Sequence, residues 1–158
     1  MSEDARAAAL ARLSAQIGSE VHVSDWLQVT QQRVDAFAEA TGDHQWIHVD
    51  RERAVRESPW GTTIAHGYLT LSLYPMLRGL VDAGTPPFPG VRQVINYGLD
   101  KLRFPNAVKV DARIRARCTM LRVEEIPAAL QIAEQYTVEI EGESKPACVA
   151  EAIMRLYF

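Results

Sequence analysis

The sequence lacks several features that mark other classes of protein. It contains only two cysteines, Cys118 and Cys148, each within an alternating apolar segment. We therefore predict buried thiols in a reducing compartment, with a disulfide between them as the less favoured alternative. No apolar run approaches the roughly 20 residues that cross a bilayer, and the first four residues, Met-Ser-Glu-Asp, are acidic where a signal peptide would be basic. We expect a cytoplasmic protein with no membrane partner.

The chain also lacks a large excess of either positive or negative charge. Seventeen Lys and Arg residues stand against twenty Asp and Glu residues, the net charge is −3, and no run of five or more like charges occurs. A weakly acidic chain has no electrostatic footprint for nucleic acid, so we predict no nucleic-acid partner. Hydrophobic residues make up 47% of the chain and charged residues 23%, which is typical of a globular protein, and 158 residues suit a single domain.

Three catalytic and cofactor motifs are missing. The chain has no G-x-S-x-G nucleophile elbow and no glycine-rich phosphate loop, so we expect neither an activated serine nor a nucleoside triphosphate or dinucleotide cofactor. His44 and His48 stand four residues apart, as in zinc peptidases. However, the position after the first histidine is Gln45, where those enzymes carry the glutamate that acts as general base. We therefore predict that no metal is bound.

What the chain does contain is an aspartate and a histidine in one short stretch, Thr41–His48, with the sequence TGDHQWIH. Asp43 follows Gly42, and His48 lies five residues further on between Ile47 and Val49. Histidine titrates near neutral pH, so a histidine held between apolar neighbours near a carboxylate suits general acid–base catalysis. In the alternative interpretation, Asp43 is a turn residue and His48 packs in the core.

A second short segment, Ala65-His66-Gly67, is expected to face the first. Because Gly67 has no side chain, a substrate carbonyl could approach its backbone N–H, which would stabilise an enolate oxygen. The alternative is a plain glycine at the start of a helix. For His66 the sequence favours a packing or loop-fixing role over that of a second base.

Four segments before residue 60 have the patterns of regular elements. The spacing of apolar residues predicts helices over residues 4–17, 31–41 and 51–57 and an extended segment over 20–29. Thr30 and Asp50 stand at the N-cap positions of the second and third helices, and Gly42 ends the second. Residues 43–48 are therefore predicted to form a loop between two helices.

The second half of the chain changes from helical to period-two patterning. Residues 67–80 are apolar nearly all round, which predicts a buried helix with a kink or break at Pro75. A Pro- and Gly-rich loop follows at 84–90. Apolar residues then alternate with polar ones over 108–119, 130–140 and 148–158, with a turn at 141–146. These segments predict an α+β fold in which an antiparallel sheet wraps around one buried helix.

Two longer stretches carry a family resemblance. Residues 37–50 (FAEATGDHQWIHVD) and 63–70 (TIAHGYLT) resemble the MaoC-like dehydratase family, the (R)-specific enoyl-CoA hydratases of hotdog fold. Asn96-Tyr97-Gly98, Arg103-Phe104-Pro105 and the closing strands are similar to the C-terminal half of those proteins. The resemblance covers residues 20–158, leaving 1–19 as an N-terminal helical extension.

The resemblance also points to a subgroup. Many family members carry Asn-Pro where this chain has Gln45-Trp46. The Gln-Trp form resembles single-domain proteins that include mycobacterial hydratases and relatives of nodulation protein N.

The resemblance implies a mechanism. Residues matching Asp43 and His48 hold one water and act as base and acid. They add it syn across a trans-2-enoyl thioester, giving an (R)-3-hydroxyacyl-CoA in a reversible reaction. The N–H matching Gly67 binds the thioester oxygen. The remaining candidates for substrate binding are His66, Tyr68, Asn96 and Gly98, the last two having a turn or β-bulge as their alternative role.

The resemblance further implies that no metal or redox cofactor is required, because the substrate itself carries coenzyme A, and that the protein is a homodimer. Two other functions stay open at this stage. One is a hotdog acyl-CoA thioesterase, which would hydrolyse the thioester, and the other is an acyl-thioester binding protein without catalysis.

Overall fold

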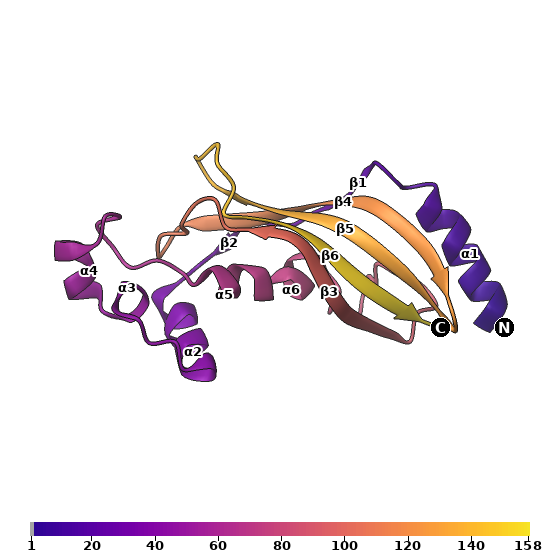
Figure 1. The fold of residues 1–158 in the computed structure, drawn as a ribbon, viewed down its shortest axis with the longest axis horizontal. Coiled ribbons are helices and arrows are strands. Elements are labelled where there is room, and N and C mark those ends of the chain that lie inside the picture. The colour runs from indigo at the N-terminus through magenta and orange to yellow at the C-terminus, as the bar shows by residue number, and fades with distance from the viewer. Residues whose placement is uncertain (1) are drawn as a thin grey trace.

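A computed structural model describes residues 2–158, in which a curved antiparallel sheet arches over two short helices (Figure 1). The helices are α1 (Ser2–Ser14), α2 (Gln31–Thr41), α3 (Trp46–Val49), α4 (Arg51–Glu57), α5 (Gly67–Ser72) and α6 (Tyr74–Leu77). The strands are β1 (Glu20–Val23), β2 (Leu27–Gln28), β3 (Gln93–Arg103), β4 (Arg113–Ile126), β5 (Ala129–Ile140) and β6 (Cys148–Tyr157). The α+β prediction, with an antiparallel sheet wrapped on a central helix, is confirmed.

The strand order is β1-β4-β5-β6-β3. β2 pairs with the first two residues of β4, on the same edge of β4 as β1. Because β4, β5 and β6 are neighbours both in sequence and in the sheet, the predicted antiparallel meander is confirmed. Along β4 the side chains alternate as expected, with Ile114, Ala116 and Cys118 fully buried on the concave face. This alternation places one face of the sheet on the core and leaves the other to solvent.

The predicted strand over 108–119 begins later than expected, at Arg113. Asp111 has a φ of 69°, and this left-handed conformation interrupts the extended backbone. The residues before it pair with a different partner: the Ala65 N–H donates to the Val108 carbonyl over 2.8 Å, and the Val110 N–H donates to the Thr63 carbonyl over 2.9 Å. The predicted segment 20–29 likewise divides into β1 and β2 around Trp26.

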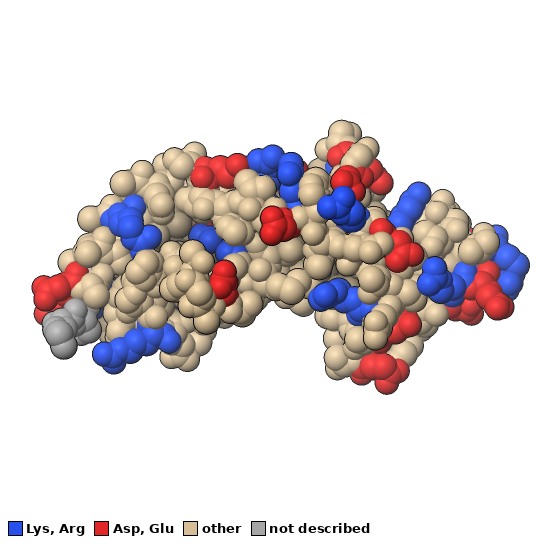
Figure 2. Space-filling view, turned by 180° about the vertical axis from the view of Figure 1, so that it is seen from behind, with Lys and Arg blue, Asp and Glu red and all other residues tan. Residues whose placement is uncertain are grey.

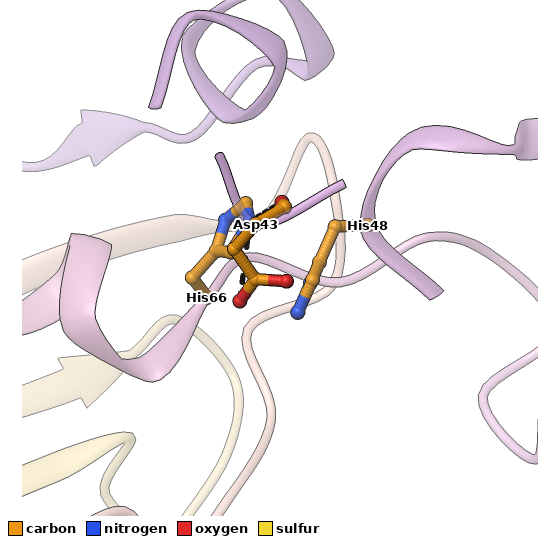
Figure 3. Close-up of side chains that lie close together, drawn as sticks. All are labelled: Asp43, His48 and His66. Atoms are coloured by element: carbon orange, nitrogen blue, oxygen red, sulfur yellow. Dashed lines mark hydrogen bonds and ion pairs between the residues drawn. The ribbon is translucent and has the colours of Figure 1, made fainter. Parts of the chain in front are cut away.

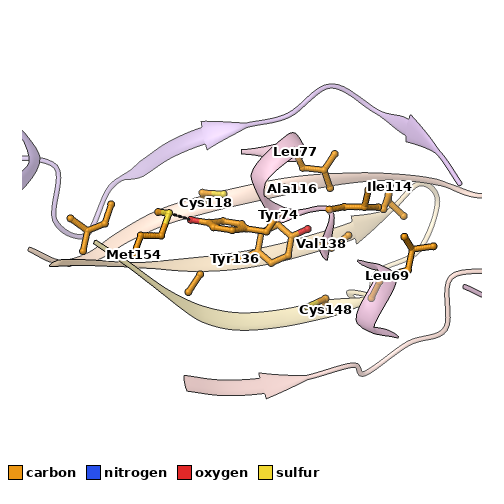
Figure 4. Close-up of a cluster of buried hydrophobic side chains, with 14 of the residues drawn as sticks. Leu69, Tyr74, Leu77, Ile114, Ala116, Cys118, Tyr136, Val138, Cys148 and Met154 are labelled. Carbon is orange, nitrogen blue, oxygen red and sulfur yellow. Dashed lines mark hydrogen bonds between the residues drawn. The ribbon is translucent and has the colours of Figure 1, made fainter. Parts of the chain in front are cut away.

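The helix predicted over 67–80 divides into α5 and α6 at Leu73, as the proline suggested. Pro75 lies in the first turn of α6, where the missing N–H leaves no bond unmade. Leu69 and Leu77 are buried against the sheet (Figure 4). Burying a leucine side chain stabilises the fold by about 1.5–3 kcal/mol. These contacts therefore fix α5 and α6 against the sheet, and with them the position of Gly67 at the start of α5.

One buried ion pair crosses the interface between α6 and β5. Arg78 is 5% exposed and Glu134 is 0% exposed, and the guanidinium donates from Nε and Nη2 to the two carboxylate oxygens, each over 2.8 Å. The Tyr74 hydroxyl donates to the same carboxylate over 2.7 Å. Burial of a charged pair is tolerated here because the hydrogen bonds satisfy the charged groups.

Helices α2, α3 and α4 project beyond the sheet, and α1 packs at the opposite end with Ala9 and Leu13 in the core (Figure 1). Seen from behind, a hollow in the lower edge separates the projecting part from the body, and charges of both signs are interspersed over this face (Figure 2). Of the helices in residues 2–158, none is long and apolar enough to span a bilayer. The proposed division into an extension (1–19) and a domain (20–158) stays a prediction.

The predicted capping residues set the boundaries of the projecting helices. Thr30 Oγ1 accepts a hydrogen bond from the Arg33 N–H at the start of α2, and Asp50 Oδ1 accepts from the Arg53 N–H at the start of α4. Gly42 ends α2 with a φ of 78°. The predicted loop over 43–48 is shorter than expected, because α3 begins at Trp46 and places His48 on a helical turn. The short helix was missed because four residues are too few to establish a helical period.

Candidate active site

Asp43, His48 and His66 meet at the junction of the projecting helices and α5 (Figure 3). One carboxylate or ring atom from each lies within 4.8 Å of the others. Asp43 comes from the loop after α2, His48 from α3, and His66 directly precedes Gly67 at the start of α5. The predicted proximity of the two segments is confirmed.

His48 is held by its ring and by its backbone. The side chain is 6% exposed, and Nδ1 lies 2.8 Å from the Ile64 carbonyl oxygen. A carbonyl can only accept, so Nδ1 carries the proton and the neutral ring keeps a lone pair on Nε2. Burial lowers the pKa of His48 below its ordinary value; the adjacent His66 also lowers this pKa, whereas the Ile64 carbonyl and Asp43 act against the shift. The ring is therefore neutral at pH 7 and can accept a proton.

Asp43 is more exposed than its partner. Its side chain is 51% accessible to solvent, and Oδ1 accepts a hydrogen bond from the Gln45 N–H over 3.3 Å. The left-handed conformation at Gly42 reverses the chain after α2 and directs Asp43 toward His48. Within residues 2–158, no hydrogen bond directly joins the Asp43 carboxylate to the His48 ring. The Asp43 carboxylate and the His48 ring are therefore close together without a direct hydrogen bond between them.

Gln31 also holds the site, although no sequence pattern pointed to it. Its Nε2 donates to the His48 carbonyl oxygen over 2.7 Å, while its Oε1 accepts from the Thr63 hydroxyl. These bonds tie the first turn of α2 to α3 and to the segment before His66. A glutamine in the first turn of an amphipathic helix is usually solvated, so only the tertiary arrangement identifies this role.

A cavity of about 380 Å³ opens beside His48. It is lined by His48, Trp60, Ile64, Ala65, Gly67, Thr70, Phe104, Pro105, Asn106, Ala107, Val108 and Ala147. Gly67 is the first residue of α5, and no acceptor within residues 2–158 takes a hydrogen bond from its N–H. The lining is mostly apolar and includes a few polar side chains, as in many ligand sites.

The other predicted substrate contacts are spread more widely. Tyr68 is 67% exposed beside the cavity, and its ring meets Phe104 edge-on with centroids 5.9 Å apart. Asn96 and Gly98 lie at a register shift in β3, which agrees with the β-bulge given as their alternative role. They line a separate apolar cavity with Leu71. Substrate contact by Tyr68, Asn96, Gly98 and His66 stays a prediction.

The two histidines first considered as a metal pair do not form one. His44 lies outside α3 and its Nε2 is 2.6 Å from Glu39 Oε1, which raises the pKa of His44. The group that the fold assembles is instead Asp43, His48 and His66. The rings of His48 and His66 are stacked, 3.8 Å apart with planes inclined by 23°. Their in-plane lone pairs therefore lie in two nearly parallel planes, whereas a tetrahedral zinc site needs them to converge on one point.

Both cysteines are free and buried, as predicted. Burial raises the pKa of the Cys118 thiol to about 12 and that of the Cys148 thiol to about 12. Nucleophilic attack requires the thiolate, so neither cysteine provides an activated nucleophile.

An antiparallel sheet curved over a central helix is the fold that this chain shares with hotdog-fold dehydratases. The model of the MaoC-like domain matches residues 12–141. The chain belongs to the MaoC-like dehydratase family, and it is a hydro-lyase.

Relatives with established names support this assignment. The chain is 50% identical over 147 residues to 3-hydroxyacyl-thioester dehydratase Z of Mycobacterium tuberculosis H37Rv, covering 92% of this chain and 94% of that protein. It is 43% identical over 150 residues to nodulation protein N of Rhizobium leguminosarum bv. viciae, covering 94% and 91%. The predicted subgroup is therefore confirmed.

Solved structures support the hotdog fold. The unliganded R-hydratase PhaJ1 of Pseudomonas aeruginosa superposes with a TM-score of 0.68 at 23% identity, covering 89% of this chain and 81% of that one.

Proposed function

We propose that the protein is an (R)-specific enoyl-CoA hydratase that adds water syn to trans-2-enoyl-CoA and, in reverse, dehydrates (R)-3-hydroxyacyl-CoA. The observation that carries the proposal is the proximity of Asp43 to a neutral, oriented His48. His48 lines a cavity together with Gly67, whose N–H has no acceptor among residues 2–158. The names of the relatives, a 3-hydroxyacyl-thioester dehydratase and an R-hydratase, agree with this substrate class and stereochemistry.

The spacing of the two residues suits one bridging water. The Asp43 carboxylate and a ring nitrogen of His48 lie within 4.8 Å of one another. Both the carboxylate and the unprotonated Nε2 of His48 are acceptors. A water between two acceptors donates one hydrogen to each, at about 2.7 Å per bond. Both of its hydrogens are then engaged, and an oxygen lone pair is left to attack the substrate.

The proton transfers follow from this geometry. As the water oxygen bonds to C3 of the enoyl group, His48 Nε2 takes one water proton and the π electrons move to the thioester oxygen. The Gly67 N–H stabilises this enolate, and the Asp43 carboxylate stabilises the imidazolium. His48 then returns the proton to C2 on the face from which water was added, so the addition is syn. Atoms and charges balance without a metal or redox cofactor.

Hydration of crotonyl-CoA, followed by loss of enoyl absorbance, tests the proposal. His48→Ala is expected to lower kcat by about 10²–10⁴-fold, the usual contribution of a general acid–base group. Asp43→Asn is expected to lower kcat by about 10²–10³-fold, because Asp43 orients the water and stabilises the imidazolium electrostatically. His44→Ala is the matched control, because His44 belongs to the same loop but binds Glu39 at the surface.

Three outcomes would contradict the proposal. Full activity in both variants would remove Asp43 and His48 from the mechanism. Release of free CoA thiol without prior loss of enoyl absorbance would indicate a thioesterase. Tight acyl-CoA binding without turnover would indicate a binding protein.

We also propose that the chain forms a homodimer through β3, which occupies one edge of the sheet. An unpaired strand edge is a template for pairing with another strand. β3 exposes Ile95, Tyr97 and Leu99 with 38%, 56% and 42% of their surfaces accessible. A second copy would cover this apolar edge.

A further inference from the structure

The buried histidine at position 66 contacts both members of the catalytic pair. His66 is 3% exposed, and its Nε2 lies 2.9 Å from the Asp43 carbonyl oxygen. The carbonyl accepts, so His66 Nε2 donates this bond across 23 residues of sequence. The loop that presents Asp43 is thereby tied to the residue immediately before α5.

The ring face of His66 makes the second contact. It stacks on His48 with centroids 3.8 Å apart and planes inclined by 23°. Phe37 from α2 contacts the same His66 ring, with centroids 4.9 Å apart and an inclination of 55°. His66 is therefore packed between α2 and α3, and its ring limits the orientations open to His48.

The other ring nitrogen plays no part in these contacts. His66 Nδ1 is buried and has no hydrogen-bond partner among the described residues. Nor is His66 among the residues that line the cavity beside His48. The side chain therefore reaches Asp43 through its Nε2–H donor and His48 through its ring face.

We propose that His66 is the positioning residue of the site, which fixes Asp43 and His48 at the spacing of one bridging water and holds both in register with the Gly67 N–H. This inference rests on the proposed hydratase function. It differs from a substrate-binding role for His66, because a positioning residue acts on kcat through Asp43 and His48, whereas a substrate contact acts mainly on KM.

Two substitutions separate the donor from the ring. His66→Gln places an amide N–H near the position of the imidazole Nε2 and removes the stacked ring. His66→Phe keeps a ring but leaves the Asp43 carbonyl without its donor. A displacement of about 1 Å costs on the order of 10²-fold, so kcat for crotonyl-CoA is expected to fall about 10²-fold in His66→Phe with little change in KM. In His66→Gln we expect a smaller loss, about 10-fold, because Asp43 keeps its tether.

A double-mutant cycle with Asp43→Asn provides the decisive kinetic measurement. If His66 acts through Asp43, most of the His66→Phe loss disappears when the carboxylate is already absent, because interacting residues are not additive. Circular dichroism and Tm of each variant establish that it is folded. Additive effects, or a rise in KM with unchanged kcat, would overturn the inference while leaving the hydratase function intact.

Crystal structures of the two variants test the same inference without any activity. The Asp43 carboxylate is expected to move away from His48 in His66→Phe and to stay in place in His66→Gln. An unmoved Asp43 in His66→Phe would refute positioning by His66. Failure of the wild-type protein to hydrate crotonyl-CoA would count against the proposed function. That result comes from the activity assay, so it is distinguishable from the structural test of His66.

Discussion

The ring of Phe104 packs directly against the Cα of Gly67. A Cβ placed on Gly67 would lie 2.8 Å from Phe104 Cδ2 and 2.9 Å from Cγ, closer than real Cβ atoms approach other atoms. Phe104 follows β3 directly and is 38% exposed. The absence of a side chain at 67 is therefore required by the protein's own packing at the cavity wall, in addition to any need for substrate to approach the N–H.

Gly67→Ala should displace either Phe104 or the start of α5. We expect kcat for crotonyl-CoA hydration to fall by about 10²-fold, because the N–H stays in the chain but moves from the oxyanion position. The double variant Gly67→Ala, Phe104→Ala removes the clash and should recover much of that loss. If the double variant is no better than Gly67→Ala, the clash is not the cause.

The pH dependence of the reaction should report the lowered pKa of His48. The neutral ring is the base, so kcat/KM for hydration should hold as pH falls to 6.5 and decline only below the ordinary histidine pKa. Asp43 and His66 are the titratable groups that act on this ring. A decline centred above pH 6.5 would contradict the buried, neutral His48.

The same shift should appear in stability. Unfolded His48 binds a proton at a higher pH than the folded residue does, so the free energy of unfolding should fall as pH drops from 6.5 through the folded pKa. His48→Gln lacks this contribution. Urea unfolding of both proteins between pH 5 and pH 8 measures the difference.

Glu134→Ala should destabilise the fold strongly, because it leaves the buried Arg78 without its partner. Breaking a buried ion pair from one side typically costs about 3–5 kcal/mol. Glu139→Ala is the matched control on the same strand, since Glu139 binds Arg115 and Arg117 at the solvent face and such pairs contribute about 0–1 kcal/mol. Equal losses in the two variants, measured by urea unfolding, would contradict this difference.

Gly42→Ala should weaken the turn that presents Asp43. The φ of 78° at Gly42 is costly for alanine, about 1–2 kcal/mol, whereas asparagine tolerates the left-handed region better. We therefore expect Gly42→Ala to lose more stability and more crotonyl-CoA hydration than Gly42→Asn. Indistinguishable Tm and kcat values in the two variants would show that the turn does not depend on this conformation.

Leu99→Lys should disrupt the proposed dimer. A buried charge on the edge strand opposes pairing with a second copy, so light scattering after gel filtration should show a monomer where the wild-type protein is a dimer. Val55→Lys is the control, because Val55 is 65% exposed on α4, away from β3. A wild-type monomer, or a Leu99→Lys dimer, would contradict the proposed interface.

Much of this molecule follows from local rules that operate within one segment. The capping roles of Thr30 and Asp50 are properties of short stretches in which a side-chain oxygen meets a nearby N–H. The alternation in β4 and the break before Pro75 are equally local. Residue chemistry suggested Asp43 and His48 as a pair, and family resemblance added the reaction that the pair is expected to catalyse.

Other features depend on contacts between distant segments, and no local pattern encodes them. The prediction that a strand begins at residue 108 was wrong. Val108 and Val110 pair with residues 63–65, so they keep the alternating apolar pattern although they lie outside β4. Gln31 has an ordinary helical position, and only its distance from His48 and Thr63 gives it a role.

The sequence by itself determined most of the hotdog elements, although not β3 or α3, and the reversal at Gly42. It also marked Asp43 and His48 as candidates for proton transfer. Tertiary structure decided the protonation and orientation of His48, since these depend on burial and on the Ile64 carbonyl 16 residues away. It also decided that His66 faces the protein rather than the cavity, and that Phe104 packs on Gly67. The physical reason is range: caps and periodicity act within a few residues, whereas desolvation and hydrogen bonds between segments exist only after the chain has folded.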